Sequence, residues 1–151
     1  IGAPIIAATA GKEESGAPRW SYGATVRATL GPVEFGFSGK RTGTRFVYDN
    51  NLPVYAGPAG TPATPNQTYQ VFGAKVPSYW LVNVDARVNL DFLGLNDKTF
   101  LQLNVYNLMD NFYQGGFSGG VSQAVSSGNY SIPNVQIGAP RTVSATFTMG
   151  F

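Results

Sequence analysis

Apolar and polar residues alternate along five stretches of this chain. In the last of them, Arg141 to Phe151, the apolar residues share one parity: Val143, Ala145, Phe147, Met149 and Phe151. A period of two places successive side chains on opposite faces of a strand. Each stretch is therefore predicted to be a β-strand with one apolar and one polar face. The predicted strands lie near 19–30, 33–42, 78–91, 98–109 and 141–151.

The segments between these strands alternate between long and short. Gly31 and Pro32 form one short turn, whereas 1–18, 43–77 and 110–140 are predicted to be long external loops rich in Gly, Pro, Ser and Asn. Short turns at one end and long loops at the other are typical of outer-membrane barrels. The parity of the apolar residues shifts near Arg45 to Tyr48, which favours a bulge in a continuing strand. The predicted fold class is all-β, a transmembrane antiparallel β-barrel segment that belongs to a larger barrel.

The alternation assigns the side chains to two environments. Charged residues of the polar parity, such as Glu34 and Lys40, are tolerated in a watery lumen but are costly on a face in contact with lipid. The residues expected to face lipid are Trp20, Val26, Phe35, Val84, Val88, Leu103, Val143 and Phe147. Those expected to face the lumen are Thr25, Arg27, Asp85, Arg87, Gln102, Asn104 and Thr146.

The composition narrows the classes of function. Charged residues make up 12% and aromatic residues 13% of the 151 residues, which fits strands with one face in lipid. Cysteine is absent, which excludes disulfides and thiolate metal sites, and histidine, the usual general base and a common zinc ligand, is absent too. We therefore expect no enzyme activity, no catalytic residue, no cofactor and no metal. A net charge of +2 is too small to predict nucleic acid as a partner.

Three motifs near the end of the chain carry a family resemblance. YWLVNVDARVNL at 79–90 looks like the third-from-last strand of TonB-dependent outer-membrane receptors. LQLNVYNLMDNFY at 101–113 is similar to the penultimate-strand motif of that family, with Met109 in the place where Phe is usual. GAPRTVSATFTMGF at 138–151 resembles its closing motif. Together, in this order, the three motifs resemble the end of such a receptor.

The resemblance implies that residues 1–151 are the C-terminal part of a 22-strand barrel with an internal plug. The function it implies is active uptake of a scarce nutrient (a siderophore, vitamin, saccharide or peptide) across the outer membrane of a Gram-negative bacterium. The implied partners are the remainder of the barrel with its plug, TonB through that missing part, the barrel assembly machinery, and outer-membrane lipid with lipopolysaccharide. We expect a second polypeptide carrying the plug and the earlier strands, or one longer chain.

The candidate functional residues lie on the polar parity and in the long loops. Candidate ligand-binding residues are Arg27, Asp85, Arg87, Tyr113 and Tyr130. Charges in a lumen more often serve hydration, and Asp85 with Arg87 is interpreted as a salt bridge. For the loop aromatics, packing or an interfacial belt is favoured over stacking on a sugar or aromatic ligand. Phe147 and Phe151 are interpreted as an assembly signal.

Two other functions remain open at this stage. One is a different outer-membrane barrel, such as a porin-like channel or an adhesion barrel. The other is a secreted β-sandwich that acts as a binding module, although a sandwich would have turns of similar, moderate length at both ends. A plug encoded upstream separates the first alternative from a TonB-dependent receptor, and dependence on detergent separates both barrels from the sandwich.

Overall fold

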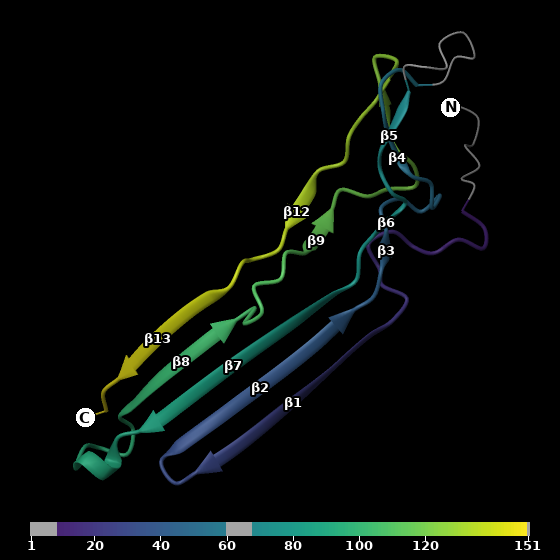
Figure 1. Ribbon diagram of the computed structural model, residues 1–151. Coiled ribbons are helices and arrows are strands. Elements are labelled where there is room, and N and C mark those ends of the chain that lie inside the picture. Colours follow the sequence, from purple (N-terminus) through teal and green to yellow (C-terminus); the bar gives the residue numbers. More distant parts are fainter. Residues whose placement is uncertain (1–8, 60–67, 151) are drawn as a thin grey trace, which may run out of the picture. The chain divides into compact units, whose positions relative to one another are not determined.

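Five long antiparallel strands form the main sheet of the chain (Figure 1). The structure is a computed structural model that describes residues 9–59 and 68–150. The strands pair in the order of the sequence: β1 (Ser21–Leu30), β2 (Val33–Thr42), β7 (Tyr79–Asn89), β8 (Phe100–Tyr106) and β13 (Thr142–Thr148). Their bounds lie within three residues of the predicted ones. The all-β, antiparallel prediction is confirmed. In the described residues the sheet is open, because β1 and β13 each pair on one side only.

The chain divides into two compact units, which are treated separately below. The sheet unit comprises Ser21–Thr42, Tyr79–Phe112 and Ala139–Phe151, and it contains the main sheet. The loop unit comprises Ile1–Trp20, Gly43–Ser78 and Tyr113–Gly138. The long connections predicted from the sequence thus gather into a unit with contacts of its own.

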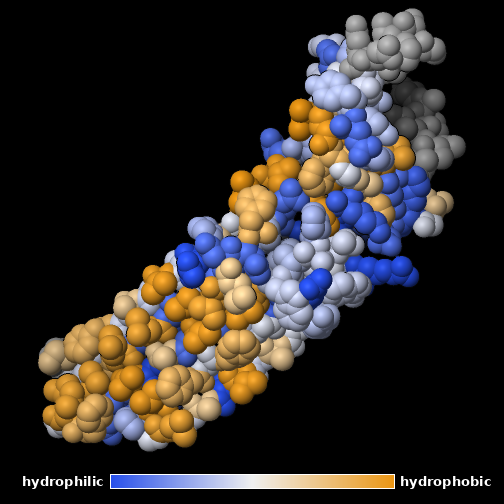
Figure 2. Space-filling view, in the orientation of Figure 1, coloured by the Kyte–Doolittle hydropathy of each residue, from blue (hydrophilic) through white to orange (hydrophobic). Residues whose placement is uncertain are grey.

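Register keeps the apolar residues of the sheet unit in phase from strand to strand. Val26 of β1 lies opposite Phe37 of β2, and Phe37 lies opposite Val84 of β7. Val84 in turn pairs with Val105 of β8, and Val105 with Val143 of β13. One face of the sheet is therefore apolar across all five strands. Figure 2 shows hydrophobic side chains gathered over this part of the chain.

The apolar face is exposed within this chain. The exposed fractions are 64% for Val26, 45% for Phe35, 63% for Val143 and 59% for Phe147. Trp20 and Leu103 are also exposed, and Val84 and Val88 are half-buried. None of the residues predicted to face lipid is packed into a core. Among the described residues, no helix has the length and apolar character needed to cross a membrane.

The short connections of the main sheet have the local chemistry that such turns require. Gly31 has a φ of 60°, and Pro32 follows it. A two-residue hairpin with glycine at its first central position matches the twist of the flanking strands. The β7–β8 connection contains a short 3₁₀ helix, η1 (Asp91–Leu93), which ends at Gly94 with a φ of 76°. Positive φ at a residue without Cβ therefore shapes both connections.

The loop unit contains short strands, which corrects the prediction that 43–77 and 110–140 are plain loops. Arg45 to Tyr48 do not continue the second strand past a bulge, because β2 ends at Thr42 and a separate pair begins. The described part of this unit contains four two-stranded pairs. They are β3 (Arg45–Phe46) with β6 (Lys75–Val76), β4 (Val54–Ala56) with β5 (Tyr69–Phe72), β9 (Gln114–Phe117) with β12 (Val135–Ile137), and β10 (Val125–Ser126) with β11 (Asn129–Tyr130). Pairs this short lack the sustained alternation that reveals a strand in a sequence.

A small core and a buried arginine hold the loop unit together. Val47, Tyr48, Val54 and Val76 form the buried cluster, against which Phe72 and Phe117 pack. Arg45 is 5% exposed, and its guanidinium donates to the carbonyl oxygens of Gln114 and Gly115. The same guanidinium lies 5.7 Å from the centroid of the Phe117 ring. These two hydrogen bonds tie β3 to β9 through the Arg45 side chain.

The segment 9–16 lies against residues 46–51. Side chains of residues 46–51 bond to the backbone of this segment, as a neighbouring strand would do. The Asn51 side chain accepts from the Glu13 amide at 3.0 Å and donates to the Glu13 carbonyl at 2.8 Å. The Asp49 carboxylate accepts from the Ser15 amide at 2.7 Å. Hydrogen bonds from the Ser15 backbone and side chain lower the pKa of Asp49 from its ordinary value. The ionised form of Asp49 is therefore the one that holds the segment.

The register of the main sheet can be tested by disulfide trapping, because the chain has no cysteine of its own. Leu103 and Ala145 are direct partners in the β8–β13 ladder, so the pair Leu103→Cys and Ala145→Cys should cross-link on mild oxidation. The control pair Leu103→Cys and Phe147→Cys is offset by two residues, to a Cα separation of about 7–8 Å, and should stay reduced. Gel mobility with and without reductant measures both. Cross-linking of the offset pair alone would contradict the register.

Docking of segment 9–16 should depend on pH through Asp49. Because its pKa is lowered in the folded state, its stabilising contribution is complete above the unfolded pKa and is lost as the pH falls through the lowered value. Hydrogen-exchange protection of the Ser15 amide should therefore fall on acidification. The charged residues Lys12, Glu13 and Glu14 line the same hollow, and their titration could also change the protection. The variant Asp49→Asn is therefore the control, because it removes only the titration of residue 49. This variant keeps an acceptor oxygen without a titrating group, and its protection should be nearly independent of pH.

Candidate functional site

The polar face of the main sheet is a grid of polar side chains aligned by the register. One row crosses all five strands, with each residue opposite the next: Arg27, Gly36, Asp85, Asn104 and Ser144. The amide nitrogen of Asn104 donates to the Ser144 hydroxyl at 3.4 Å, and Gln102 donates to the Asn104 side-chain oxygen at 3.0 Å. The predicted lumen residues thus share one face, opposite the apolar one.

An ion pair spans two strand spacings within this row. Nη1 of Arg27 lies 3.4 Å from Oδ2 of Asp85, although β2 separates their strands. Gly36 is the β2 residue between them, and a Cβ built there would lie 2.3 Å from Oδ1 of Asp85. Neighbouring strands are about 4.8 Å apart, so the contact requires the space that glycine leaves open. The Arg27 side chain is 68% exposed, and the pair remains open to solvent.

The predicted salt bridge between Asp85 and Arg87 is wrong. Asp85 pairs with Arg27 instead, and Nε of Arg87 donates to the Asn89 side-chain oxygen at 3.2 Å. The Arg87 guanidinium lies 3.8 Å from the centroid of the Phe100 ring, a cation–π contact. The Asp85 carboxylate thus turns across the sheet to Arg27, whereas the Arg87 guanidinium bonds along β7 to Asn89 and lies over Phe100 of the neighbouring strand. Only Arg27 and Asp85 of the predicted ligand-binding residues are in contact.

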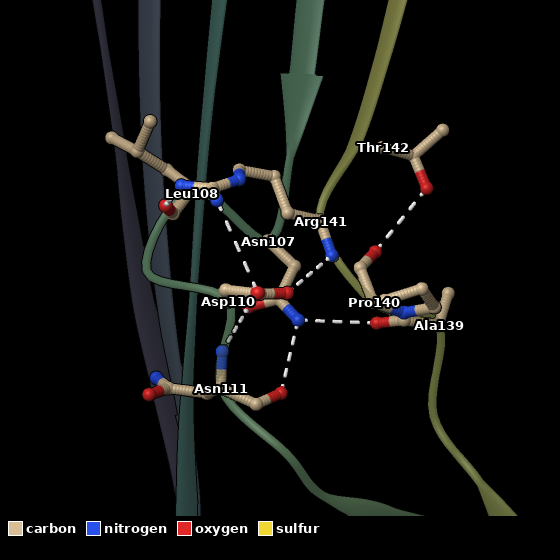
Figure 3. A network of polar contacts seen from close by, with 8 residues as sticks. All are labelled: Asn107, Leu108, Asp110, Asn111, Ala139, Pro140, Arg141 and Thr142. Carbon is tan, nitrogen blue, oxygen red and sulfur yellow. Dashed lines mark hydrogen bonds and ion pairs between the residues drawn. The ribbon is translucent and has the colours of Figure 1, made fainter.

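A polar junction joins the two motifs at 107–111 and 139–142 within the sheet unit (Figure 3). Asn107 is its centre, is 3% exposed and has a φ of 51°. Its amide nitrogen donates to the carbonyl oxygens of Asn111 at 3.0 Å and Ala139 at 3.1 Å, and its side-chain oxygen accepts from the Asn111 amide at 3.0 Å. Asparagine tolerates this left-handed backbone better than most residues. One side chain thus fixes both the turn and the approach of the next strand.

Asp110 and Arg141 form the second part of the junction. The Asp110 carboxylate accepts from the Arg141 amide at 2.8 Å and lies 4.0 Å from its guanidinium. That guanidinium also donates to the Leu108 carbonyl at 3.5 Å. The junction extends to β7, because Asn111 donates to the Trp80 carbonyl at 2.9 Å and the Asn107 amide donates to the Asn83 side-chain oxygen at 3.0 Å. The motifs at 101–113 and 138–151, which the sequence shows as separate stretches, are therefore connected by hydrogen bonds in the structure.

Tyr113 lies over a glycine in the loop unit. A Cβ built at Gly138 would come 2.0 Å from the Tyr113 ring, and the Gly138 amide donates to the Tyr113 carbonyl at 2.8 Å. An aromatic ring laid across a glycine on a neighbouring strand protects that backbone and helps to hold register. The contact identifies a packing role for this predicted ligand-binding residue.

Tyr130 lines a pocket in the loop unit. Its ring lies 5.8 Å from that of Tyr55, centroid to centroid, at an angle of 38° between the ring planes. The pocket has a volume of about 290 Å³, and Tyr48 lies in its wall. Burial raises the pKa of Tyr48, which keeps its hydroxyl protonated at neutral pH. The sequence marked Tyr130 as a candidate ligand-binding residue but did not connect it with Tyr48 and Tyr55, because no periodic pattern relates the three positions.

The remaining predicted residues have simpler positions. Phe147 lies on the exposed apolar face of β13, and Phe151 lies outside the described residues. In the described ranges, no group of three or more His, Cys, Asp or Glu side chains is placed to hold a metal ion.

Searches against protein-family models and against curated proteins find no match to this chain.

Loss of the Asn107 side chain should destabilise the sheet unit by about 2–4 kcal/mol, because the buried side chain makes three hydrogen bonds to the backbone of Asn111 and Ala139. The variant Asn107→Gly keeps the backbone conformation accessible and removes only the side-chain bonds, whereas Asn107→Ala adds strain. Chemical denaturation of the folded protein in detergent measures both effects. The matched control is Asn129→Ala, at an exposed site with a single 3.3 Å side-chain bond, where the change should stay within about 0.5 kcal/mol. Equal stability of all three variants would contradict the junction.

Proposed function

We propose that this chain is the C-terminal part of the barrel of a TonB-dependent outer-membrane transporter. The observation that carries the proposal is the exposed apolar face that runs in register across five strands, with a polar face behind it. Such a sheet suits a boundary between lipid and a watery lumen. β7 has 11 residues, and a tilted strand needs about 9–11 to cross a bilayer.

An aromatic and cationic cluster at one end of the apolar face supports the membrane assignment. Tyr22 and Trp80 meet edge to face at 5.6 Å between ring centroids. Arg41 lies between them in the register, and its guanidinium is 5.3 Å from the Trp80 ring centroid. Tyrosine and tryptophan are enriched where a membrane meets water. The cluster fits the outer rim, on the side from which the long connections leave.

The open edges support a barrel that further strands complete. In the described residues, β1 and β13 each have one unpaired edge. An unpaired backbone group in hydrocarbon costs several kcal/mol, so each edge needs a partner strand. We assign these strands to the remainder of the same barrel, on a separate or a longer chain that also carries the plug and the TonB contact.

The choice of transporter class rests on the motif resemblance and on the junction. The residues of the two resembling motifs, Asn107, Asp110 and Arg141 among them, bond to one another. These contacts make the two motifs one structural unit. In this proposal the protein imports a scarce nutrient across the bacterial outer membrane, performs no chemistry on it, and needs no cofactor. An upstream plug is required, and its absence from the encoding gene would instead favour a porin-like or adhesion barrel.

A matched pair of arginine substitutions tests the membrane assignment. Val26 and Thr25 are neighbours of similar shape on β1, but they belong to the apolar and the polar face respectively. The variant Val26→Arg should lose about 2–4 kcal/mol of folding free energy near the bilayer midplane and should fail to assemble. The variant Thr25→Arg should assemble almost as wild type. Heat-modifiable gel mobility of outer-membrane fractions measures the folded share, and equal shares for the two variants would sink the assignment.

A further inference from the structure

A pocket in the loop unit is formed by two segments that are far apart in the sequence. Residues 48–55 form one wall and residues 122–130 the other, around a volume of about 290 Å³. That volume is close to the lower end of the range for ligand pockets, roughly 300–1,000 Å³. A pocket of this volume has room for one small ring and part of a second ring joined to it.

The walls of the pocket are held by side-chain bonds to backbone. The Gln123 side chain accepts from the Tyr55 amide at 2.9 Å and donates to the Tyr55 carbonyl at 2.6 Å. It also donates to the Ser131 carbonyl at 3.0 Å. The Asn50 side-chain oxygen accepts from the Leu52 amide at 3.1 Å. These bonds fix the two segments relative to each other, so the pocket is formed before a ligand arrives.

Three tyrosine residues line this pocket. Tyr48, Tyr55 and Tyr130 all line it, and Tyr48 is only 4% exposed. Within the part of the chain that the structure describes, none of the three hydroxyls bonds to a protein group. Hydroxyl groups that the described residues leave without a protein partner can bond a ligand in place of water.

None of the described residues that line the pocket carries a charge. Its lining consists of tyrosine, asparagine, glutamine and serine, with a few apolar side chains, and contains no Lys, Arg, Asp or Glu. An anionic ferric chelate would find no cation there to offset its desolvation. A purely apolar ring would leave the tyrosine hydroxyls unpaired.

We propose that this tyrosine pocket binds a neutral saccharide ring. The ring's hydroxyls would pair with the tyrosine hydroxyls, and its C–H face would lie against the half-buried rings of Tyr55 and Tyr130. The inference rests on the proposed function and narrows its nutrient to a neutral carbohydrate. The ring pair of Tyr55 and Tyr130, which joins the two walls, the tyrosine hydroxyls and the uncharged lining all favour the same ligand class.

Binding to the full-length protein in detergent tests the pocket. The probes are an array of neutral oligosaccharides, an array of acidic oligosaccharides, and a trianionic ferric catecholate chelate in solution. We expect wild type to retain at least one neutral oligosaccharide. Retention of only acidic glycans or only the ferric chelate, or of no probe at all, would overturn the proposal.

Variants locate the binding within the pocket. The variant Tyr130→Phe keeps the ring and should weaken saccharide binding about 2–10-fold through loss of one hydroxyl. The variant Tyr130→Ala should weaken it at least about tenfold, because the ring face is lost too. Tyr69→Ala is the control, since Tyr69 is 60% exposed in the same unit and does not line the pocket. Heat-modifiable mobility verifies that each variant is folded. Unchanged affinity in Tyr130→Ala, or an equal loss in the control, would overturn the site.

Uptake by cells separates this proposal from the transporter proposal. Binding in detergent requires neither TonB nor an energised membrane. If the oligosaccharide binds through Tyr130 but its uptake persists in cells without TonB, the transporter class is wrong and the pocket stands. If uptake requires TonB but no neutral saccharide binds, the pocket assignment fails and the transporter class stands.

Discussion

The whole sheet depends on one constraint, which is that five alternating strands stay in phase. Because side chains alternate with a period of two, a slip of one residue in any ladder would send that strand's apolar side chains to the polar face. The register instead aligns Val26, Phe37, Val84, Val105 and Val143 in a single row. The segregation of two environments by one sheet follows from this alignment, and so does every functional interpretation that uses the two faces.

Different devices hold the register at the two ends of the strands. At the end with short connections, Gly31 and Gly94 adopt positive φ and close tight turns. At the other end a long excursion separates β8 from β13, and a turn cannot set their alignment. The junction around Asn107 replaces it, because its side chain bonds to the carbonyl of Ala139, three residues before β13 begins. A buried asparagine therefore sets the alignment of two strands joined by a long connection, as glycine does where the connection is short.

The polar face of the sheet and the loop unit use their polar groups differently. On the polar face of the sheet the side chains satisfy one another, as Arg27 and Asp85 do above Gly36, and they remain open to water. In the loop unit, Gln123, Asn51 and Asp49 are used to bond backbone, which stiffens segments too short to form lasting ladders. Among the described residues, the hydroxyls of Tyr48, Tyr55 and Tyr130 are used for neither purpose. That difference is what distinguishes the tyrosine pocket from the rest of the polar surface.

The sequence by itself determined the five main strands, their two faces and the alternation of short and long connections, because period-two patterning is a local property. It did not determine the short strands at 45–46 or 114–117, which have too few residues to show a period. Only the tertiary structure decided the pairings. Arg27 meets Asp85 across Gly36 of the strand between them. The rings of Tyr55 and Tyr130 meet because two long connections lie against each other. Such contacts depend on register and on loop path, which arise from the summed packing of the chain and leave no mark in any single stretch of residues.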